Sequence, residues 1–312
     1  MKVAVVGAGL SGLVAAGRLH QAGHDVVVLD KGAVPGGRLA TDWLDGAALD
    51  SGAQFFTVRS EAFAAMVDPW LRSGLVFEWT RGFSDPPDGY PRYAVRGGMA
   101  SLGAHLAAGL EVRLATMCFA IRRAAGRWDV GIDDGTSVAA DGLILTCPLP
   151  QSASLLMTAE VAVPEQLRRT DYHRTIAVLA ALDGPSAVPS PGAVQDGDPS
   201  FSFIADNQRK GVSAGPAVTL HANHEESVAH WDESPDEREA WALKAAAPWF
   251  GTARVVAARV RRWRFAGPQT IWPEACWTPE AGLPLALAGD AFAGPKVEGA
   301  ALSGLAAADL LA

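Results

Sequence analysis

The sequence predicts an α/β fold in which a Rossmann-type domain, discontinuous in sequence, is interleaved with an α+β domain. Residues 2–6 are an apolar run of strand character that leads through a glycine-rich turn into a helical pattern over 13–21. Residues 283–288 are a second apolar run, which stops at Gly289-Asp290 and precedes a helical pattern over 297–311. A strand, a glycine-bearing turn and a helix at each end indicate that both termini build one site.

The first turn has glycines at positions 7, 9 and 12, with Leu10 and Ser11 between the last two. In a dinucleotide site the first glycine permits the tight turn and the second lets backbone N–H groups approach a pyrophosphate. The third allows the helix to pack closely on the strand. The helix N-terminus adds partial positive charge. The turn therefore predicts a site for a dinucleotide.

The strand predicted over residues 25–29 ends at Asp30. A carboxylate at this place is suited to accept hydrogen bonds from a ribose diol. The same charge would repel a 2′-phosphate, so we do not expect this site to hold NADP.

The middle of the chain predicts elements of both domains. Residues 56–95 indicate a helical segment followed by a Pro-rich surface loop at 84–91, and another helix begins near Gly97. Periodicity predicts the later elements: strands at 111–122, 127–132, 141–147, 174–182 and 216–222, a loop at 184–200 and a helix at 235–248.

A chain of 312 residues exceeds the usual size of a single core, so two domains are expected. We assign residues 1–55, 96–150 and 266–312 to the nucleotide-binding domain. Residues 56–95 and 151–265 are assigned to a substrate domain.

Composition excludes several classes of function. The net charge of −8 argues against a nucleic-acid or anionic-membrane partner. The three cysteines, at 118, 147 and 276, show neither metal-ligand spacing nor a disulfide framework, which is typical of a reducing compartment. No apolar stretch is long enough to span a bilayer, and a strand that begins at residue 2 leaves no room for a signal peptide. We expect a cytoplasmic protein with no metal site.

The continuation of the first motif, Gly36-Gly37-Arg38, resembles the extended dinucleotide motif of the flavin amine-oxidase superfamily, with Ala16, Leu19 and Gly23 also in register. Gly289-Asp290 is similar to the signature with which those proteins hold the ribityl and pyrophosphate part of FAD. Residues 96–99 resemble the Gly-Gly-Met that opens a helix below the flavin, and residues 111–121 resemble a strand whose backbone near Cys118 reads the adenine edge.

This resemblance implies an amine-oxidase/p-hydroxybenzoate-hydroxylase-like fold with FAD as cofactor. The position of Cys276 relative to Gly289 does not match a covalent-flavin pattern, so we expect FAD to be non-covalent. The residues expected to bind it are Gly7, Gly9, Leu10, Ser11, Gly12, Asp30, Lys31, Gly37, Arg38, Gln54, Phe55, Phe56, Gly98, Met99, Cys118, Thr146, Gly289, Asp290, Lys296, Val297, Glu298 and Ala300.

Within the superfamily the chain resembles the bacterial renalase-like flavoproteins, through residues 50–57, 204–211, 262–266 and 297–304. The resemblance covers almost the whole chain. It implies an oxidase that takes hydride from 2- and 6-dihydro-NAD(P), gives NAD(P)+ and reoxidises with O2 to H2O2. Its partners would be a small-molecule dinucleotide and O2.

Flavin chemistry needs the substrate carbon held over N5, and the organic chemistry belongs to the cofactor. The helix that starts near Val297 is expected to direct its positive end at the flavin N1/C2=O region, where it would stabilise the anionic reduced flavin. Hydride loss from a dihydronicotinamide leaves an aromatic cation, so we expect no catalytic acid–base pair.

A dinucleotide substrate needs polar partners for its carboxamide and riboses and cations for its phosphates. Asn207, Arg209 and Lys210 supply both in one short segment, which could equally be an ordinary solvated turn. His221 is a further predicted contact, although a histidine on a strand is more often structural. Trp263 could stack on the substrate or pack in the core.

Three alternatives stay open. A true amine oxidase usually clamps its substrate between aromatic rings, but the only tyrosines are Tyr90, Tyr93 and Tyr172, and tryptophan or phenylalanine would have to substitute. The Rab-escort and GDP-dissociation-inhibitor proteins share the architecture without FAD, and the retained phosphate and ribose determinants argue against that reading. A phytoene-desaturase-type enzyme would favour a more apolar region than residues 195–235.

Overall fold

The computed structural model describes every residue except Asp85, so the loop predicted over 84–91 lies partly outside the described residues. The chain divides into two compact units. Unit 1 contains residues 1–37, 103–172 and 267–312, and unit 2 contains residues 38–102 and 173–266. Compared with the predicted division, residues 38–55 and 96–102 lie in unit 2 and residues 151–172 lie in unit 1. The assignment of cofactor and substrate to separate domains stays a prediction.

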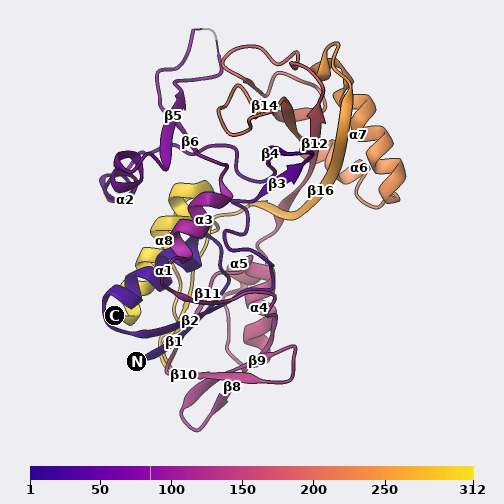
Figure 1. The fold of residues 1–312 in the computed structure, drawn as a ribbon. Coiled ribbons are helices and arrows are strands. Elements are labelled where there is room, and N and C mark those ends of the chain that lie inside the picture. The colour runs from indigo at the N-terminus through magenta and orange to yellow at the C-terminus, as the bar shows by residue number, and fades with distance from the viewer. Residues whose placement is uncertain (85) are drawn as a thin grey trace. The chain divides into compact units, whose positions relative to one another are not determined.

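Unit 1 is built on a parallel sheet of five strands in the order β17-β11-β1-β2-β7. Figure 1 labels β11, β1 and β2 of this sheet. Strand β1 lies between β11 and β2, so that Val5 is opposite Ile144 on one side and Val28 on the other. Four of these strands, β17, β11, β1 and β2, are largely buried and apolar, as expected for a sheet with both faces covered. The edge strand β7 exposes Glu111 and Arg113. Their bounds are β1 (Lys2–Val6), β2 (Asp25–Leu29), β7 (Glu111–Arg113), β11 (Gly142–Leu145) and β17 (Leu285–Leu287).

Strands from both ends of the chain, β1 and β17, lie in this sheet on either side of β11; that the two ends build one site stays a prediction. Helices α1 (Leu10–Gln21) and α8 (Lys296–Leu311) follow these strands and lie side by side (Figure 1). They approach backbone to backbone: a Cβ added at Gly304 would lie 2.2 Å from the carbonyl oxygen of Ser11. Their small and apolar side chains form a core with the sheet, which includes Leu13 and Ala307.

The strand predicted over 111–122 is wrong as a single element. Strand β7 belongs to the parallel sheet, whereas β8 (Cys118–Ala124) belongs to an antiparallel sheet with β9 (Arg127–Ile132) and β10 (Ser137–Ala140). The chain turns between them at Ala115, whose φ is +49° and whose N–H donates to the carbonyl of Gly32. The remaining helices that lie wholly in unit 1 are α4 (Leu149–Met157) and α5 (Glu165–Arg168).

Unit 2 contains a sheet in the order β13-β14-β15-β12-β16 and two smaller hairpins, β3–β4 and β5–β6. The predicted helix at 235–248 is confirmed as α7, which begins with a capping box between Ser234 and Glu237 and ends at Gly251. The elements are β3 (Thr41–Leu44), β4 (Ala47–Asp50), α2 (Glu61–Arg72), β5 (Val76–Thr80), β6 (Arg92–Val95), β12 (Tyr172–Leu182), β13 (Ala193–Gln195), β14 (Phe201–Asp206), β15 (Ala217–Ala222), α6 (His224–Ala229), α7 (Pro235–Phe250) and β16 (Val255–Pro268). Helix α3 (Ala100–Ala107) begins in unit 2, and its residues from Gly103 onward belong to unit 1.

The helix predicted within 56–95 is confirmed as α2, but the β5–β6 hairpin after it was not anticipated. Its strands are short and separated by the residues of the predicted loop, so no tight turn marks the pairing in the sequence. Within the described part of the chain, no helix has the length and apolarity needed to cross a bilayer.

Close packing of α1 and α8 predicts opposite effects for the same substitution at two helical glycines. Gly304→Ala should lower the free energy of unfolding by about 1–3 kcal/mol, because the added methyl group collides with backbone. Gly17→Ala, in the interior of α1 with no atom within 4 Å of the added Cβ, should raise it by up to about 1 kcal/mol through helix propensity. Urea denaturation measures both, and a stabilised Gly304→Ala protein would contradict the packing argument.

Candidate cofactor and substrate sites

In unit 1 the turn between β1 and α1 has two glycines that the protein itself requires. Gly7 has φ +112°, and a Cβ there would lie 2.5 Å from Oγ1 of Thr146, at the end of β11. A Cβ at Gly12 would lie 1.9 Å from the carbonyl oxygen of Gly7. Thr146 Oγ1 is also within 3.1 Å of the carbonyl oxygens of Val6 and Gly7. The turn is therefore held tightly against the neighbouring strand.

Gly9 differs from these two glycines. A Cβ at this position would meet no protein atom within 4 Å, and the backbone has φ −74°, which any residue can adopt. Packing therefore does not require a glycine here. A group that must approach the backbone of the turn closely does require one, as in dinucleotide sites.

Ser11 lies in the first turn of α1 and is buried, yet its Oγ has no hydrogen-bond partner among the described residues. A buried hydroxyl without a partner costs about 1–3 kcal/mol. The first N–H groups of a helix also lack partners within the helix, and the first turn of α1 carries no acidic side chain. These donors fit a phosphate group, so the residues present suit the pyrophosphate of a dinucleotide.

Asp30 follows β2 and fixes the other side of the turn. Its carboxylate accepts hydrogen bonds from the N–H groups of Ala8 and Gly32, both at 2.6 Å. Gly36 donates its N–H to the carbonyl of Ala8, and a Cβ on Gly37 would lie 3.3 Å from the Cα of Gly9. The structure thus brings the second predicted motif against the first; the predicted ribose contact of Asp30 stays a prediction.

The C-terminal motif lies at the end of β17, next to β11 in the sheet. Gly289 has φ +143°, and its N–H donates to Oγ of buried Ser303 on α8. Asp290 is buried. A Cβ on Gly299 would lie 1.7 Å from the carbonyl oxygen of Gly294, which fixes the approach of the chain into the helix. Helix α8 begins at Lys296, so Val297, Glu298 and Ala300 lie in its first turns.

The three cysteines are free thiols. Burial raises the pKa of Cys118 to about 11 and that of Cys147 to about 12. It also raises the pKa of Cys276. Thiols with such pKa values are weak nucleophiles at neutral pH. Among the described residues no cluster of histidine, cysteine and acidic side chains could hold a metal ion.

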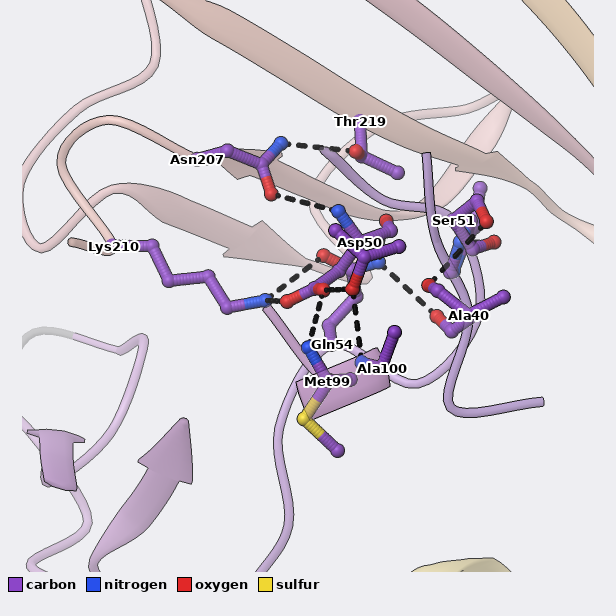
Figure 2. A network of polar contacts seen from close by, with 12 residues as sticks. Ala40, Asp50, Ser51, Gln54, Met99, Ala100, Asn207, Lys210 and Thr219 are labelled. Carbon is purple, nitrogen blue, oxygen red and sulfur yellow. Dashed lines mark hydrogen bonds and ion pairs between the residues drawn. The ribbon is translucent and has the colours of Figure 1, made fainter. Parts of the chain in front are cut away.

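Unit 2 contains a buried polar network around Asp50, at the end of β4 (Figure 2). One carboxylate oxygen accepts from the hydroxyl of Thr41 and from the N–H of Met99, both at 2.7 Å. The other accepts from Nζ of Lys210 at 2.6 Å, and both side chains are fully buried. Gln54 Nε2 donates to the carbonyl oxygen of Asp50 at 2.5 Å. This network was not anticipated from the sequence.

Two predicted substrate contacts, Asn207 and Lys210, have protein partners in this network, and their contact with a substrate stays a prediction. Lys210 is buried in its ion pair with Asp50, and Asn207 is fully buried as well. The amide oxygen of Asn207 accepts from the N–H of Asp50, and its nitrogen donates to Oγ1 of Thr219 (Figure 2). Both side chains therefore make structural contacts in a folded turn. Arg209 is about half exposed, at 48%, and lies 3.6 Å from the carboxylate of Asp206; its substrate contact stays a prediction.

His221 and Trp263, predicted as substrate contacts, meet at one backbone carbonyl. Nε2 of His221 lies 3.1 Å from the carbonyl oxygen of Ser51, and Nε1 of Trp263 donates to the same oxygen at 2.7 Å. A carbonyl can only accept, so Nε2 of His221 carries the hydrogen. Burial lowers the pKa of His221 to about 4, which makes it neutral at physiological pH. The guanidinium of Arg261 lies over the ring of Trp263 at 4.4 Å.

Three further residues of unit 2 that are predicted to bind the cofactor, Arg38, Phe55 and Phe56, contact different parts of the protein. Arg38 donates to the carbonyl oxygens of Phe265 and Ala266. Phe56 is buried and stacks on Tyr93, with ring centroids 5.6 Å apart. Phe55 belongs to an aromatic cluster that consists of Phe55, Trp79, Phe83 and Phe203.

The tautomer and depressed pKa of His221 predict a pH dependence of stability. The unfolded state binds a proton near pH 6.5 and the folded state only near pH 4, so stability falls as pH decreases through this window. His221→Gln keeps an N–H donor but cannot titrate in this range. The free energy of unfolding of this variant should therefore fall less steeply than that of the wild type as the pH decreases. His20→Gln, at an exposed position, is the matched control and should keep the wild-type slope. If the free energy of unfolding depended on pH equally in all three proteins, a lowered pKa of His221 in the folded state would be contradicted.

Comparison with known proteins is consistent with this geometry. Residues 5–70 match a family of NAD(P)-binding Rossmann-like domains. A hydroxyneurosporene desaturase from Rubrivivax gelatinosus is 45% identical over 67 residues, which are 20% of this chain and 13% of that protein. An uncharacterized protein from Methanothermococcus thermolithotrophicus is 43% identical over 61 residues, which are 20% of this chain and 59% of that protein. The chain thus matches less than two thirds of the length of either relative.

Solved structures show the same fold over nearly the whole chain. A protein from Exiguobacterium sp. 255-15, provisionally assigned as a protoporphyrinogen oxidase, has a TM-score of 0.77 at 15% identity, with 99% of this chain and 98% of that chain covered. Cyclohexylamine oxidase from Brevibacterium oxydans IH-35A has a TM-score of 0.74 at 15% identity, with 99% and 98% covered. The family of flavin-containing amine oxidoreductases matches residues 70–312. This protein therefore belongs to the flavin-containing amine oxidoreductase family.

Proposed function

We propose that this protein is an FAD-dependent oxidase that takes hydride from aberrant dihydronicotinamide dinucleotides, the 2- and 6-dihydro isomers of NAD(P)H. A ring C–H bond loses its hydrogen together with the bonding electron pair, which returns the substrate to NAD(P)+. O2 then takes the two electrons with two protons, one of them from solvent, and gives H2O2. The flavin, when bound, supplies the acceptor for the hydride.

One observation carries this choice of substrate: the titratable side chains of the Asp50 network are committed to protein partners. His221 donates its Nε2–H to a carbonyl, and its pKa of about 4 makes it a weak base at neutral pH. Lys210 is held by Asp50. A dihydronicotinamide that loses hydride becomes an aromatic pyridinium and needs no base. Side chains whose N–H groups are already hydrogen-bonded to the protein are therefore compatible with a substrate that needs no base.

Positive charge on β16 supports a substrate that contains phosphate. Arg259 and Arg261 share the single carboxylate of Asp42, at 2.6 and 2.7 Å, so this cluster carries surplus positive charge. Burial alone would raise the pKa of Asp42, but hydrogen bonds from Ser51, Arg259 and Arg261 outweigh it and lower the pKa. Guanidinium groups are suited to phosphate oxygens. With half-exposed Arg209, they are the candidate partners for the substrate pyrophosphate in unit 2.

In unit 1, Gly9 and Ser11 would hold the cofactor pyrophosphate, and Asp30 a ribose. Non-covalent binding of FAD is part of the proposal. The N-terminal end of α8, near Val297, would contribute partial positive charge. The glycines at 7 and 12 hold this turn in shape before any ligand arrives.

A second candidate is an amine oxidase, because the Phe55 aromatic cluster lies next to the polar network: Nζ of Lys210 is 5.4 Å from the ring centroid of Trp79. The fold neighbours include putrescine oxidase bound to putrescine, at 18% identity and a TM-score of 0.72. The tyrosines do not form an aromatic pair around a substrate: Tyr172 is buried, Tyr93 stacks on Phe56 and Tyr90 is exposed. The proposal therefore favours the dinucleotide.

The proposal predicts which compounds reduce the bound flavin. The purified protein is mixed without oxygen with 2- and 6-dihydro-NAD isomers, and the flavin absorbance is followed in a stopped-flow instrument. We expect rapid bleaching with these isomers and little with ordinary NADH or benzylamine. Bleaching by amines alone would move the assignment to amine oxidase. A protein that no donor of either kind reduces would overturn the proposed substrate.

A further inference from the structure

Strand β16 carries arginines on both faces of its sheet, but only one face provides them with a carboxylate. Successive side chains of a strand point to opposite faces. Arg259 and Arg261 lie on one face, where they share the carboxylate of Asp42. Arg262 and Arg264 alternate with them and lie on the other face. Their guanidinium groups lie over aromatic rings, and neither has an acidic partner among the described residues.

A second guanidinium group meets that of Arg262 at the ring of Trp231. Arg174 lies on β12, the neighbour of β16 in the sheet, and its Cζ is 5.2 Å from the centroid of this ring. The Cζ of Arg262 is 5.3 Å from the same centroid, and its Nη1 donates to the carbonyl oxygen of Trp231 at 2.8 Å. Arg262 is exposed and Arg174 is half-buried. In the described part of the chain Arg174 also lacks an acidic partner, so two accessible cations meet at one ring without an anion.

Trp231 is held in place by a third arginine, which is buried. It follows α6 and packs against the core of this sheet, and α6 and α7 lie beside β16 (Figure 1). Arg238, in α7, is 6% exposed and donates to the carbonyl oxygens of His230 and Trp231 at 3.1 and 3.2 Å. Burial lowers the pKa of Arg238, and the positive charge of Arg262 lowers it further. The positive charge at Trp231 is therefore felt by its neighbours.

Acidic side chains near this cluster do not pair with its arginines. The charges of Asp232 and Glu233 act to raise the pKa of Arg238, although burial outweighs them. Neither carboxylate forms an ion pair with an arginine within the part of the chain that the structure describes, and Glu233 lies 2.8 Å from Nδ1 of His230. An aromatic ring attracts a guanidinium group without removing its charge. The ring of Trp231 thus fixes two guanidinium groups whose charge stays available to an anion.

We propose that Arg174 and Arg262 form a phosphate-binding site on unit 2, in which Trp231 holds the two guanidinium groups in place. A phosphate group presents several oxygens and about two negative charges, which suit two planar guanidinium groups. The ligand is free phosphate or a phosphate monoester of a nucleotide, since both present this group. Every residue of the site belongs to unit 2, whereas the phosphate site proposed at the start of α1 belongs to unit 1. The inference goes beyond the proposed function and needs neither the flavin nor the dihydronicotinamide substrate.

Titration of the purified holoprotein with inorganic phosphate in chloride buffer tests the inference, with the broadening of the phosphorus NMR resonance as the readout. We expect Arg174→Gln and Arg262→Gln each to weaken phosphate binding by about tenfold or more, since each removes charge-assisted hydrogen bonds. Arg262→Lys keeps the charge but loses the planar group, so its affinity should lie between those of Arg262→Gln and the wild type. Adenosine monophosphate distinguishes the two sources of the ligand. Tighter binding than that of phosphate assigns the site to a nucleotide, and equal binding assigns it to phosphate itself.

Arg254→Gln is the matched control, because Arg254 is an exposed arginine just before β16 that is paired with Asp183. It should leave phosphate binding unchanged. Ser11→Ala, in unit 1, should leave the losses caused by the variants of Arg174 and Arg262 unchanged. A wild-type protein that does not broaden the resonance would overturn the inference. Binding that both glutamine variants keep, or that Arg254→Gln weakens equally, would overturn it as well.

Thermal unfolding of each variant checks that the fold is kept. Should the glutamine variants fail to fold, Arg174→Lys and Arg262→Lys decide, because both keep a cation over the ring of Trp231. Weaker phosphate binding in both lysine variants would support the site, and wild-type affinity in both would overturn it. Flavin reduction plays no part in this measurement, so its outcome is separate from that of the proposed function.

Discussion

A single buried carboxylate, that of Asp50, organises unit 2. An isolated ionised group in the interior of a protein is costly, so its position demands donors. The donors come from Thr41, the backbone N–H of Met99 and Lys210, which lie far apart in sequence. The adjacent carbonyl of Ser51 receives N–H groups from His221 and Trp263. The segment that follows β4 is thus fixed on both sides by polar contacts, which leaves it little conformational freedom.

Unit 1 depends on close contact between backbones. Gly7, Gly12 and Gly304 are required by the protein, because a Cβ at each would collide with a neighbouring atom. Gly9 has no such neighbour, and Ser11 keeps a hydroxyl without a partner among the described residues. This contrast separates positions that shape the turn from positions suited to a ligand. It supports a phosphate at the start of α1 independently of any sequence motif.

Local signals were sufficient to predict much of the fold from the sequence. The strands and helices at both ends, and α7 with its capping box, follow from periodicity and from residues close together in the chain. The break between β7 and β8 was missed, because it depends on a turn at Ala115 that pairs with Gly32. The β5–β6 hairpin joins strands across a long connection, and nothing local marks the pairing.

The candidate site also has one part that local sequence signals predict and one part that depends on residues far apart in the chain. The glycine turn is a local motif, and the structure brings Gly9, Asp30 and Gly37 together as a motif of this kind implies. Asn207 and Lys210 were predicted to face a substrate because their segment is polar. Their burial depends on Asp50, which is 160 positions from Lys210 in the sequence. A charged residue at the end of the apolar run 47–49 was the only available signal, and it does not name its partner.

The most direct test of the account is the identity of the flavin that the purified protein releases. Denaturation followed by chromatography and mass determination distinguishes FAD, FMN and a covalently attached flavin. The site at the start of α1 predicts that FAD, which contains the pyrophosphate, is released intact into the supernatant. Release of FMN, or flavin that remains attached to the denatured chain, would contradict the account.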